Sequence, residues 1–194
     1  METELSPRAT EIATCARSLL AAGGYNGFSY ADISASVGIS KASIHHHFPS
    51  KAELVRAVLV GYREEARAGL AMLAQQVPGP VEQLEAYAGY WAACIRDGSS
   101  PFCICAMLAA ELPAIPGEVA DEVRGHFSDL AAWLAAVLAK GASQRLLFLH
   151  ATPEAEALAF MAAVHGAMLS ARAYGDAEVF PATVRPFLRR LTSQ

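Results

Sequence analysis

Apolar residues recur at helical spacing along almost the whole chain. The pair Ser6-Pro7 fits the cap and first position of a helix, and the apolar positions behind it repeat every three or four residues up to the glycine pair at 23–24. The same spacing predicts a long helix after residue 53, further helices up to Leu191, and a kink at Pro186. No segment shows sustained alternation of apolar and polar residues, so we expect an all-α chain of about nine helices.

Residues 29–47 predict two short helices joined by a tight turn. Ser29 and Asp32 form a capping-box pattern, and Ser40 is placed to cap a second short helix that runs through residue 47. Gly38, in the turn between them, suits the left-handed backbone conformation. With the preceding helix, this spacing is that of a helix-turn-helix unit, whose last short helix enters the major groove of DNA. The small core expected of this unit comprises Ile33, Val37, Ile39, Ile44 and Phe48.

The continuous stretch from Phe28 to Leu54, FSYADISASVGISKASIHHHFPSKAEL, resembles the DNA-binding signature of TetR-type (TetR/AcrR) transcriptional regulators. The resemblance implies a helix-turn-helix DNA-binding domain at residues 6–52 and a larger all-helical ligand-binding and dimerisation domain at residues 53–194. It also implies a homodimer on palindromic double-stranded operator DNA, because two recognition helices must meet two half-sites about 34 Å apart.

The resemblance implies that DNA is contacted from both short helices and from the start of the long helix behind them. Phosphate contacts are expected from Ser29, Tyr30 and, with help from a helix N-terminus, Lys51. Base edges are expected to face the side chains at 41–43. The full expected set is Ser29, Tyr30, Ser40, Lys41, Ala42, Ser43, His45, His46, His47 and Lys51.

Three consecutive histidines, at 45–47, stand where members of this family more often have an aromatic-histidine-aromatic run that meets the DNA backbone. An imidazole can donate to a phosphate, and its charge depends on pH. The alternative is a metal site, but successive helical residues point about 100° apart, so three in a row cannot chelate one ion from one face. We therefore expect DNA-backbone contacts here and no metal. The alternative for Lys41, Lys51 and Arg56 is a solvated face.

Composition bears on the cellular location of the protein and on where its many apolar residues are buried. Hydrophobic residues make up 54% of the 194-residue chain and the mean hydropathy is +0.27, yet no uncharged apolar run of about 18 residues is present to span a membrane. The start, METELSPRAT, has no secretory signal pattern, so a cytoplasmic protein with no membrane partner is expected. The net charge of −4 argues against unspecific coating of nucleic acid, although residues 38–56 are electropositive. The apolar excess is expected inside the fold, in a subunit interface or around an apolar ligand.

Aromatic and methionine residues on the central helices are candidates for the lining of an effector pocket, although most are expected to be core. The resemblance implies a small apolar or amphipathic effector, and no cofactor is expected. Residues 103–111, CICAMLAAE, resemble a segment from a branch of the family that includes sensors of reactive electrophiles, and the alternative for Cys103 is a small buried hydrophobe. The candidate ligand or sensor set is Cys103, Tyr62, Tyr90, Trp91, Met107 and Phe127.

Two stripes on the helix predicted between Pro153 and Tyr174 indicate how two copies pair. The bulky stripe is Leu158, Met161, His165, Met168 and Leu169. The small stripe, which allows close approach of another helix, is Ala155, Ala159, Ala162, Gly166, Ser170 and Ala173. With four residues of the last helix, the small stripe is expected to form a four-helix interface with a second copy, and packing within one chain is the alternative. Those four residues are Phe180, Val184, Phe187 and Leu188.

These observations favour a ligand-responsive DNA-binding transcriptional regulator, a repressor that a small molecule releases from its operator. The alternative is a thiol-based electrophile- or redox-sensing regulator that acts through Cys103. No nucleotide-binding glycine loop, His-Glu-x-x-His motif or serine elbow is present, so no enzyme is expected. Asp121, Glu122 and His126 are interpreted as a solvated helix face. A helical binding module without DNA activity would show no salt-sensitive DNA binding.

Overall fold

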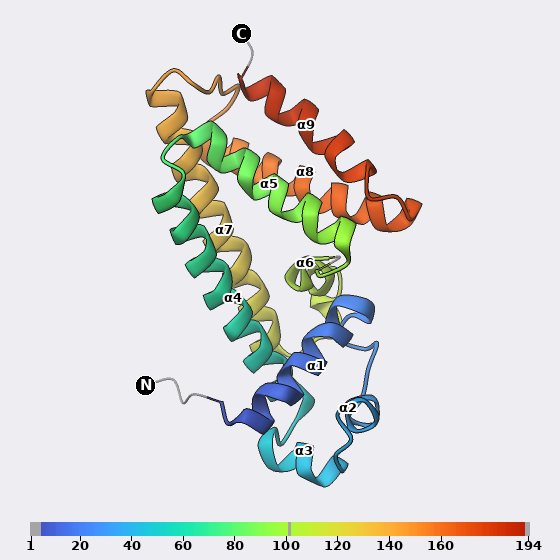
Figure 1. The fold of residues 1–194 in the computed structure, drawn as a ribbon. Helices are drawn as coiled ribbons and strands as arrows, with labels where there is room; N and C mark the ends of the chain where they lie inside the picture. The colour runs from blue at the N-terminus through green and yellow to red at the C-terminus, as the bar shows by residue number, and fades with distance from the viewer. Residues whose placement is uncertain (1–4, 101, 193–194) are drawn as a thin grey trace. The chain divides into compact units, whose positions relative to one another are not determined.

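The computed structural model describes residues 5–100 and 102–192, and the regular structure in these ranges is entirely helical, which confirms the all-α prediction (Figure 1). No helix within these ranges is both long and apolar enough to cross a membrane. In chain order the elements are α1 (Pro7–Gly23), α2 (Tyr30–Val37), α3 (Lys41–His47), α4 (Lys51–Gln76), α5 (Pro80–Asp97), α6 (Ile104–Ala109), the 3-10 helix η1 (Leu112–Ala114), α7 (Gly117–Ser143), α8 (Pro153–Tyr174) and α9 (Val179–Thr192).

The first helices begin at capping residues that are visible in the sequence. The Ser6 hydroxyl caps α1, with Pro7 at the first helical position. Ser29 and Asp32 form the complete capping box of α2, and the Ser40 hydroxyl caps α3 by accepting a backbone N–H at 3.1 Å. Each such cap stabilises its helix by about 1 kcal/mol. The predicted starts of these three helices are therefore confirmed.

The described residues belong to two compact units. Unit 1 combines the N-terminal helices and the first part of α4 with α6, η1 and the start of α7, whereas unit 2 holds the other helical segments. The bounds are Met1–Glu65 with Cys103–His126 for unit 1 and Ala66–Phe102 with Phe127–Gln194 for unit 2. The predicted domains at 6–52 and 53–194 are functional divisions that compactness does not test, so they stay a prediction.

Aliphatic side chains from several helices share the core of unit 1. α1 packs on α2 and on α6, and α2 packs on α3. Full burial of one such side chain is worth about 1.5–3 kcal/mol. The fully buried aliphatic side chains include Ile12, Leu20, Ile33, Ile44, Leu54, Leu59 and Leu108. Because Leu108 lies on α6, this short helix belongs to the same core as the helix-turn-helix.

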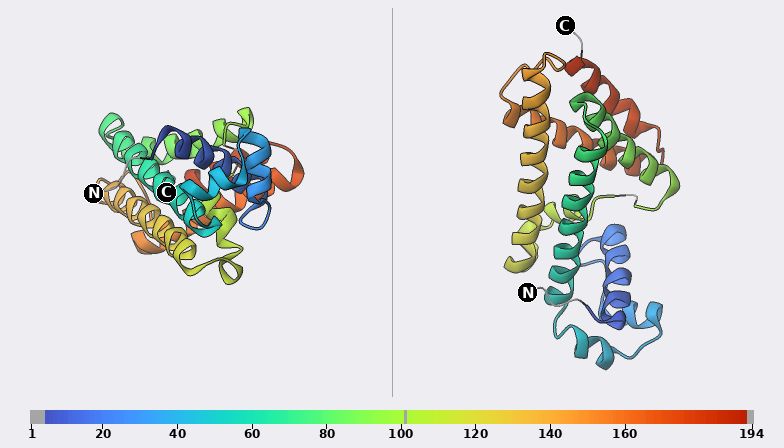
Figure 2. Two further views of the ribbon diagram at one scale, coloured as in Figure 1. Left: turned by 90° about the horizontal axis from the view of Figure 1, so that it is seen from below. Right: turned by 60° about the vertical axis from the view of Figure 1, so that its left-hand side comes forward.

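Unit 2 is built around a helical hairpin. α8 and α9 lie side by side, and α5 packs against α9 (Figures 1 and 2). The buried face of α8 includes Phe160, Val164 and Met168, and α9 contributes Phe180 and Val184. These buried side chains and the Phe160–Phe187 ring contact make the packing of the hairpin apolar.

The structure shows which sides of the last two helices are buried and corrects the expected place of two residues of α9. Leu158 and Leu169, two members of the bulky stripe, are 55% and 60% exposed. α8 is apolar almost all the way round, so periodicity alone could not determine which apolar face is buried. Phe180 and Val184, predicted at an interface between copies, are almost completely buried within the chain by the α8–α9 packing. The outward face of α8 therefore combines two leucines with most of the predicted small stripe: Ala155, Ala159, Ala162, Gly166 and Ala173.

Candidate nucleic-acid interface

A short turn and a shared apolar contact hold α2 and α3 together. Gly38 adopts φ 73° and ψ 30°, the left-handed region that a residue with a Cβ enters at a cost of about 1–2 kcal/mol. Across the turn, the Ser34 hydroxyl donates to the Ile39 carbonyl at 2.5 Å. Ile33 of α2 and Ile44 of α3 are both fully buried. The helix-turn-helix predicted from the residue spacing is therefore present in unit 1.

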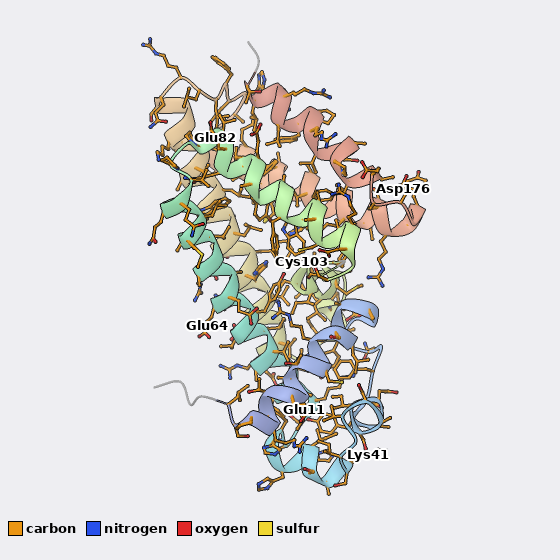
Figure 3. All side chains as sticks on the ribbon, in the orientation of Figure 1. Glu11, Lys41, Glu64, Glu82, Cys103 and Asp176 are labelled. Atoms are coloured by element: carbon orange, nitrogen blue, oxygen red, sulfur yellow. The ribbon has the colours of Figure 1, made fainter. Side chains whose placement is uncertain are left out.

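α3 turns one side outward, as a groove-reading helix must. Lys41, Ala42, His45 and His46 are exposed, whereas Ile44 is buried. The exposed positions recur one helical turn apart and so share a side of the helix. Figure 3 labels Lys41 at the start of α3. The structure thus leaves the expected base-reading end of α3 accessible, with Ser40 exposed and Ser43 and His47 half-buried.

Beside α3 lies an open groove with a volume of about 400 Å³. It brings together the start of α2, the start of α4 and one side of α3, so residues that are distant in sequence meet at one surface. The His45 ring lies edge-on to Tyr30 with centroids 4.7 Å apart, and its Nδ1 is 3.2 Å from the Pro49 carbonyl oxygen. The groove is lined by Phe28, Ser29, Tyr30, Ala31, Lys41, His45 and Lys51. Five of these belong to the expected DNA-contacting set: Ser29, Tyr30, Lys41, His45 and Lys51.

Tyr30 has a structural bond that the sequence did not reveal. Its side chain is buried, and its hydroxyl donates to the Phe48 carbonyl oxygen at 2.8 Å. Burial, reinforced by the negative charge of Glu53, raises the pKa of Tyr30 to about 12. The hydroxyl therefore stays protonated and ties α2 to the end of α3. The phosphate contact expected of Tyr30 stays a prediction, and the side chain of Ser29 beside it is exposed.

Lys51 is half-buried at the edge of the groove. Its ammonium group donates to the Phe28 carbonyl oxygen and lies 4.2 Å from the centre of the Phe28 ring and 4.8 Å from that of Tyr25. Burial lowers the pKa of Lys51, and the negative charges of Glu111 and Asp32 oppose this shift. An ammonium group has three N–H donors. Lys51 can thus fix the α1–α2 loop and still offer a donor to an anion in the groove.

A carboxylate from the segment after α6 secures the same loop. Glu111 accepts a hydrogen bond from the Tyr25 N–H at 2.6 Å. Gly24, at φ 73°, leaves room for it, because a Cβ at this position would lie 2.5 Å from Glu111 Oε1. Glu111 was not among the residues predicted from sequence. The only local signal was the glycine pair at 23–24, which marks the end of α1 but not its contact 86 residues away.

Replacing Glu111 with alanine is expected to destabilise unit 1 by about 1–2 kcal/mol and to weaken DNA binding. The substitution leaves the Tyr25 N–H without its charged acceptor and loosens the loop on which Lys51 rests. Urea denaturation and fluorescence anisotropy with labelled DNA would measure the two effects. Glu85→Ala, at an exposed carboxylate within α5, is the control. Equal stability and affinity of both variants would contradict the role of Glu111.

A second cluster of polar side chains surrounds Cys103, which lies far from Lys41 within unit 1 (Figure 3). The Tyr62 hydroxyl donates to Cys103 Sγ at 3.4 Å, and His126 Nε2 lies 3.8 Å from the same sulfur.

The expected solvated face at 121–126 is wrong for two residues. His126 is only 6% exposed, and Glu122 is largely buried and paired with Arg63 at 2.5 Å, because this part of α7 packs into unit 1.

The neighbouring thiol of Cys105 is protonated, whereas a reactive cysteine is a thiolate. A hydrogen bond with Cys103 and burial raise the pKa of the Cys105 thiol. Cys105 is therefore a protonated, inert side chain at neutral pH.

Within residues 5–100 and 102–192, no three His, Cys, Asp or Glu side chains are placed to hold one metal ion.

The structure divides the candidate ligand or sensor residues between the units. Cys103, Tyr62 and Met107 belong to unit 1, whereas Tyr90, Trp91 and Phe127 belong to unit 2. Trp91 is buried and Phe127 half-buried, but Tyr90 is exposed, which is not the environment of an enclosed pocket.

Similarity to known proteins covers both parts of the chain. Residues 12–58 match the family described as bacterial regulatory proteins, tetR family, and residues 80–187 match the tetracyclin repressor-like C-terminal domain. A TetR-family transcriptional regulator from Agrobacterium tumefaciens is 56% identical, with a TM-score of 0.94 over 96% of this chain and 98% of that one. The chain belongs to the TetR family of transcriptional regulators. It is a DNA-binding transcriptional regulator.

Other TetR-family relatives are more distant. A TetR regulator from Legionella pneumophila is 26% identical, with a TM-score of 0.85 over 97% of this chain and 98% of that one. The HTH-type transcriptional regulator UidR of Escherichia coli is 35% identical over 68 residues, which is 35% of each protein. The chain thus aligns with about a third of the length of this curated relative. The first family match, at 12–58, includes the helix-turn-helix and all residues lining the groove.

Proposed function

We propose that this TetR-family protein is a repressor that binds a palindromic operator as a homodimer and is released by a small molecule. The observation that carries the proposal is the outward side of α3 beside a groove lined by Lys41, His45 and Lys51. Base edges would face residues 41–43, and a phosphate would lie in the groove.

The outward face of α8 supports the homodimer. Leu158 and Leu169 are exposed there among small residues, and a Cβ on Gly166 would meet nothing within 4 Å. Exposed apolar side chains in a continuous stripe favour association, and small residues permit close approach of a partner helix. With Phe180 and Val184 buried, only Phe187 and Leu188 of the four residues expected from α9 stay partly exposed.

Release by an effector follows from a shift between two arrangements of the dimer. The effector would bind in unit 2 and favour an arrangement in which the recognition helices no longer match the half-site spacing. Its effect is limited by the difference between its affinities for the two arrangements.

Selection of binding sites from a random DNA pool tests the proposal. The expected result is a palindrome with half-sites about 10 base pairs apart, or a multiple of this spacing. Lys41→Ala is expected to weaken binding and to reduce the slope of log K against log salt by about 0.9 for each phosphate that is no longer neutralised. Lys140→Ala, which removes the same charge from unit 2, is expected to leave both unchanged. A pool without an enriched palindrome, or equal salt slopes for both variants, would contradict the proposal.

The surroundings of Cys103 favour a second candidate, a regulator that senses electrophiles through this thiol. The Tyr62 hydroxyl and the His126 imidazole both lie at the sulfur, and such donors stabilise the nucleophilic thiolate. The thiol proton would leave to water or to His126. The thiolate would form a bond to the electrophilic carbon of an alkylating agent, and the bond from that carbon to its leaving group would break, with the leaving group departing as an anion.

Iodoacetamide labelling followed by mass spectrometry tests this second candidate. Cys103 is expected to react faster than the other buried thiols, Cys94 and Cys105, by about 10-fold, and His126→Gln is expected to remove the difference. The His126 variant must retain its thermal transition, which controls for general opening of unit 1. No preferential labelling of Cys103 would end the sensor hypothesis.

A further inference from the structure

Unit 2 contains buried N–H groups that bind nothing within the described part of the chain. They are Trp91 Nε1 on α5, Trp133 Nε1 on α7 and His165 Nε2 on α8. Trp91 is only 6% exposed. An indole N–H is a donor only, whereas an imidazole nitrogen donates or accepts according to its tautomer.

These groups contrast with other buried polar side chains of the same unit, which are satisfied. Gln83 donates to the Val77 carbonyl oxygen at 2.6 Å. Glu156 accepts from the His150 N–H at 3.0 Å and from Arg190 at 3.1 Å. A buried donor without an acceptor costs about 1–3 kcal/mol. Such a cost at several positions in one unit points to acceptors supplied by a bound molecule or by water.

Aromatic contacts connect the helices that carry these groups. Tyr87 lies one turn before Trp91 on α5. The centre of its ring is 5.7 Å from that of the Trp133 ring and 6.3 Å from that of the Phe160 ring. The His165 ring is 5.2 Å from that of Phe127. These rings give the region the apolar and planar lining typical of small-molecule sites.

Helix geometry gives the spacing of these ring contacts along the helices. Phe127 and Trp133 are six residues apart on α7, which corresponds to a rise of about 9 Å, and the five residues from Phe160 to His165 on α8 correspond to about 7.5 Å. The two groups of ring contacts therefore lie about 7.5–9 Å apart along α7 and α8. A probe with three fused rings matches this spacing.

We infer that Trp91, Trp133 and His165 recognise the effector, and that the effector is a flat, uncharged, mainly apolar molecule with at least two hydrogen-bond acceptors, such as an aryl ketone, ester or lactone. This inference rests on the proposed effector response. A cation without acceptor atoms would leave the N–H donors without a hydrogen-bond acceptor. An anion would need a charged partner to offset its desolvation, which neutral indole groups do not supply.

Probes with one three-ring frame test the acceptor requirement. Xanthone carries a carbonyl and a ring oxygen, 9,10-dihydroanthracene carries no acceptor, and N-methylacridinium is a cation. Xanthone is expected to bind at least 10-fold more tightly than either of the others. Because the chain has 2 tryptophans, the ¹⁵N–¹H spectrum contains two indole signals, and xanthone is expected to shift both.

Variants that keep an aromatic ring but remove the indole N–H test whether these residues bind the probe. Trp91→Phe and Trp133→Phe are each expected to weaken xanthone binding about 10-fold and to leave dihydroanthracene unchanged. Tyr174→Phe, at an exposed ring, is the control. If either variant fails to melt cooperatively, the indole shifts of the unaltered protein remain as the test.

Equal binding of xanthone and the hydrocarbon, preference for the cation, or no binding of any probe up to its solubility would overturn the inference. Operator binding of the same samples is measured in parallel. Operator binding with no probe binding overturns this site alone, whereas the absence of sequence-specific DNA binding overturns the proposed function.

Discussion

Replacing Gly166 with leucine is expected to give a folded monomer that binds operator DNA on the order of 100-fold more weakly, since linked half-site binding contributes at least this factor. Gly166 lies on the outward face of α8, and a Cβ there meets nothing within 4 Å in its own chain. The leucine therefore has room in the monomer. In the proposed homodimer it would separate the paired helices, which approach closely only over small side chains.

Sedimentation velocity and fluorescence anisotropy would measure the oligomeric state and the operator affinity of this variant. Gly69→Leu is the matched control, because Gly69 is also an exposed helical glycine whose Cβ would meet nothing within 4 Å. Leucine favours the helix over glycine by nearly 1 kcal/mol at both positions, so neither chain should lose stability. A dimeric Gly166→Leu protein with unchanged affinity would show that dimerisation uses another surface.

Truncating Ile44 to alanine is expected to cost about 3 kcal/mol of stability and to abolish specific DNA binding at moderate salt. Ile44 is fully buried and is the residue through which α3 is anchored on the core of unit 1. Removal of three methyl or methylene groups from such a position costs about 2–5 kcal/mol, because a cavity adds to the reduced burial. Without this anchor, the outward side of α3 is no longer held in one orientation.

Urea denaturation and operator anisotropy on a graded pair of variants would separate stability from recognition. Ile44→Val removes one methylene group and is expected to cost only about 1 kcal/mol. It should therefore retain most of the operator affinity. An alanine variant that is destabilised yet binds DNA normally would show that α3 is positioned by contacts other than Ile44.

The helical boundaries of the N-terminal motif could be predicted because their causes are local. Ser29, Asp32 and Ser40 cap helices through bonds that span at most three residues. Gly38 could be identified in the same way, because the short turn between the two helices needs a residue with a positive φ. Most of the groove-lining residues were predicted for a related reason, since they occupy positions in the short segment that resembles the family signature.

The partners of those side chains were not predictable in the same way. Tyr30 bonds to Phe48, and Lys51 to Phe28, across 18 and 23 residues. Glu111 reaches Tyr25 across 86 residues. Such pairs depend on how helices pack, and no spacing rule within one segment encodes them.

The sequence by itself determined that this protein is all-helical and carries a helix-turn-helix, because helix period, caps and turn glycines act within a few residues of one another. Only the tertiary structure decided which apolar face of α8 is buried, that Phe180 and Val184 lie inside the chain, and that His126 lies beside Cys103. A helix that is apolar on several sides can bury any of them, so the choice is made by the helices that pack against it.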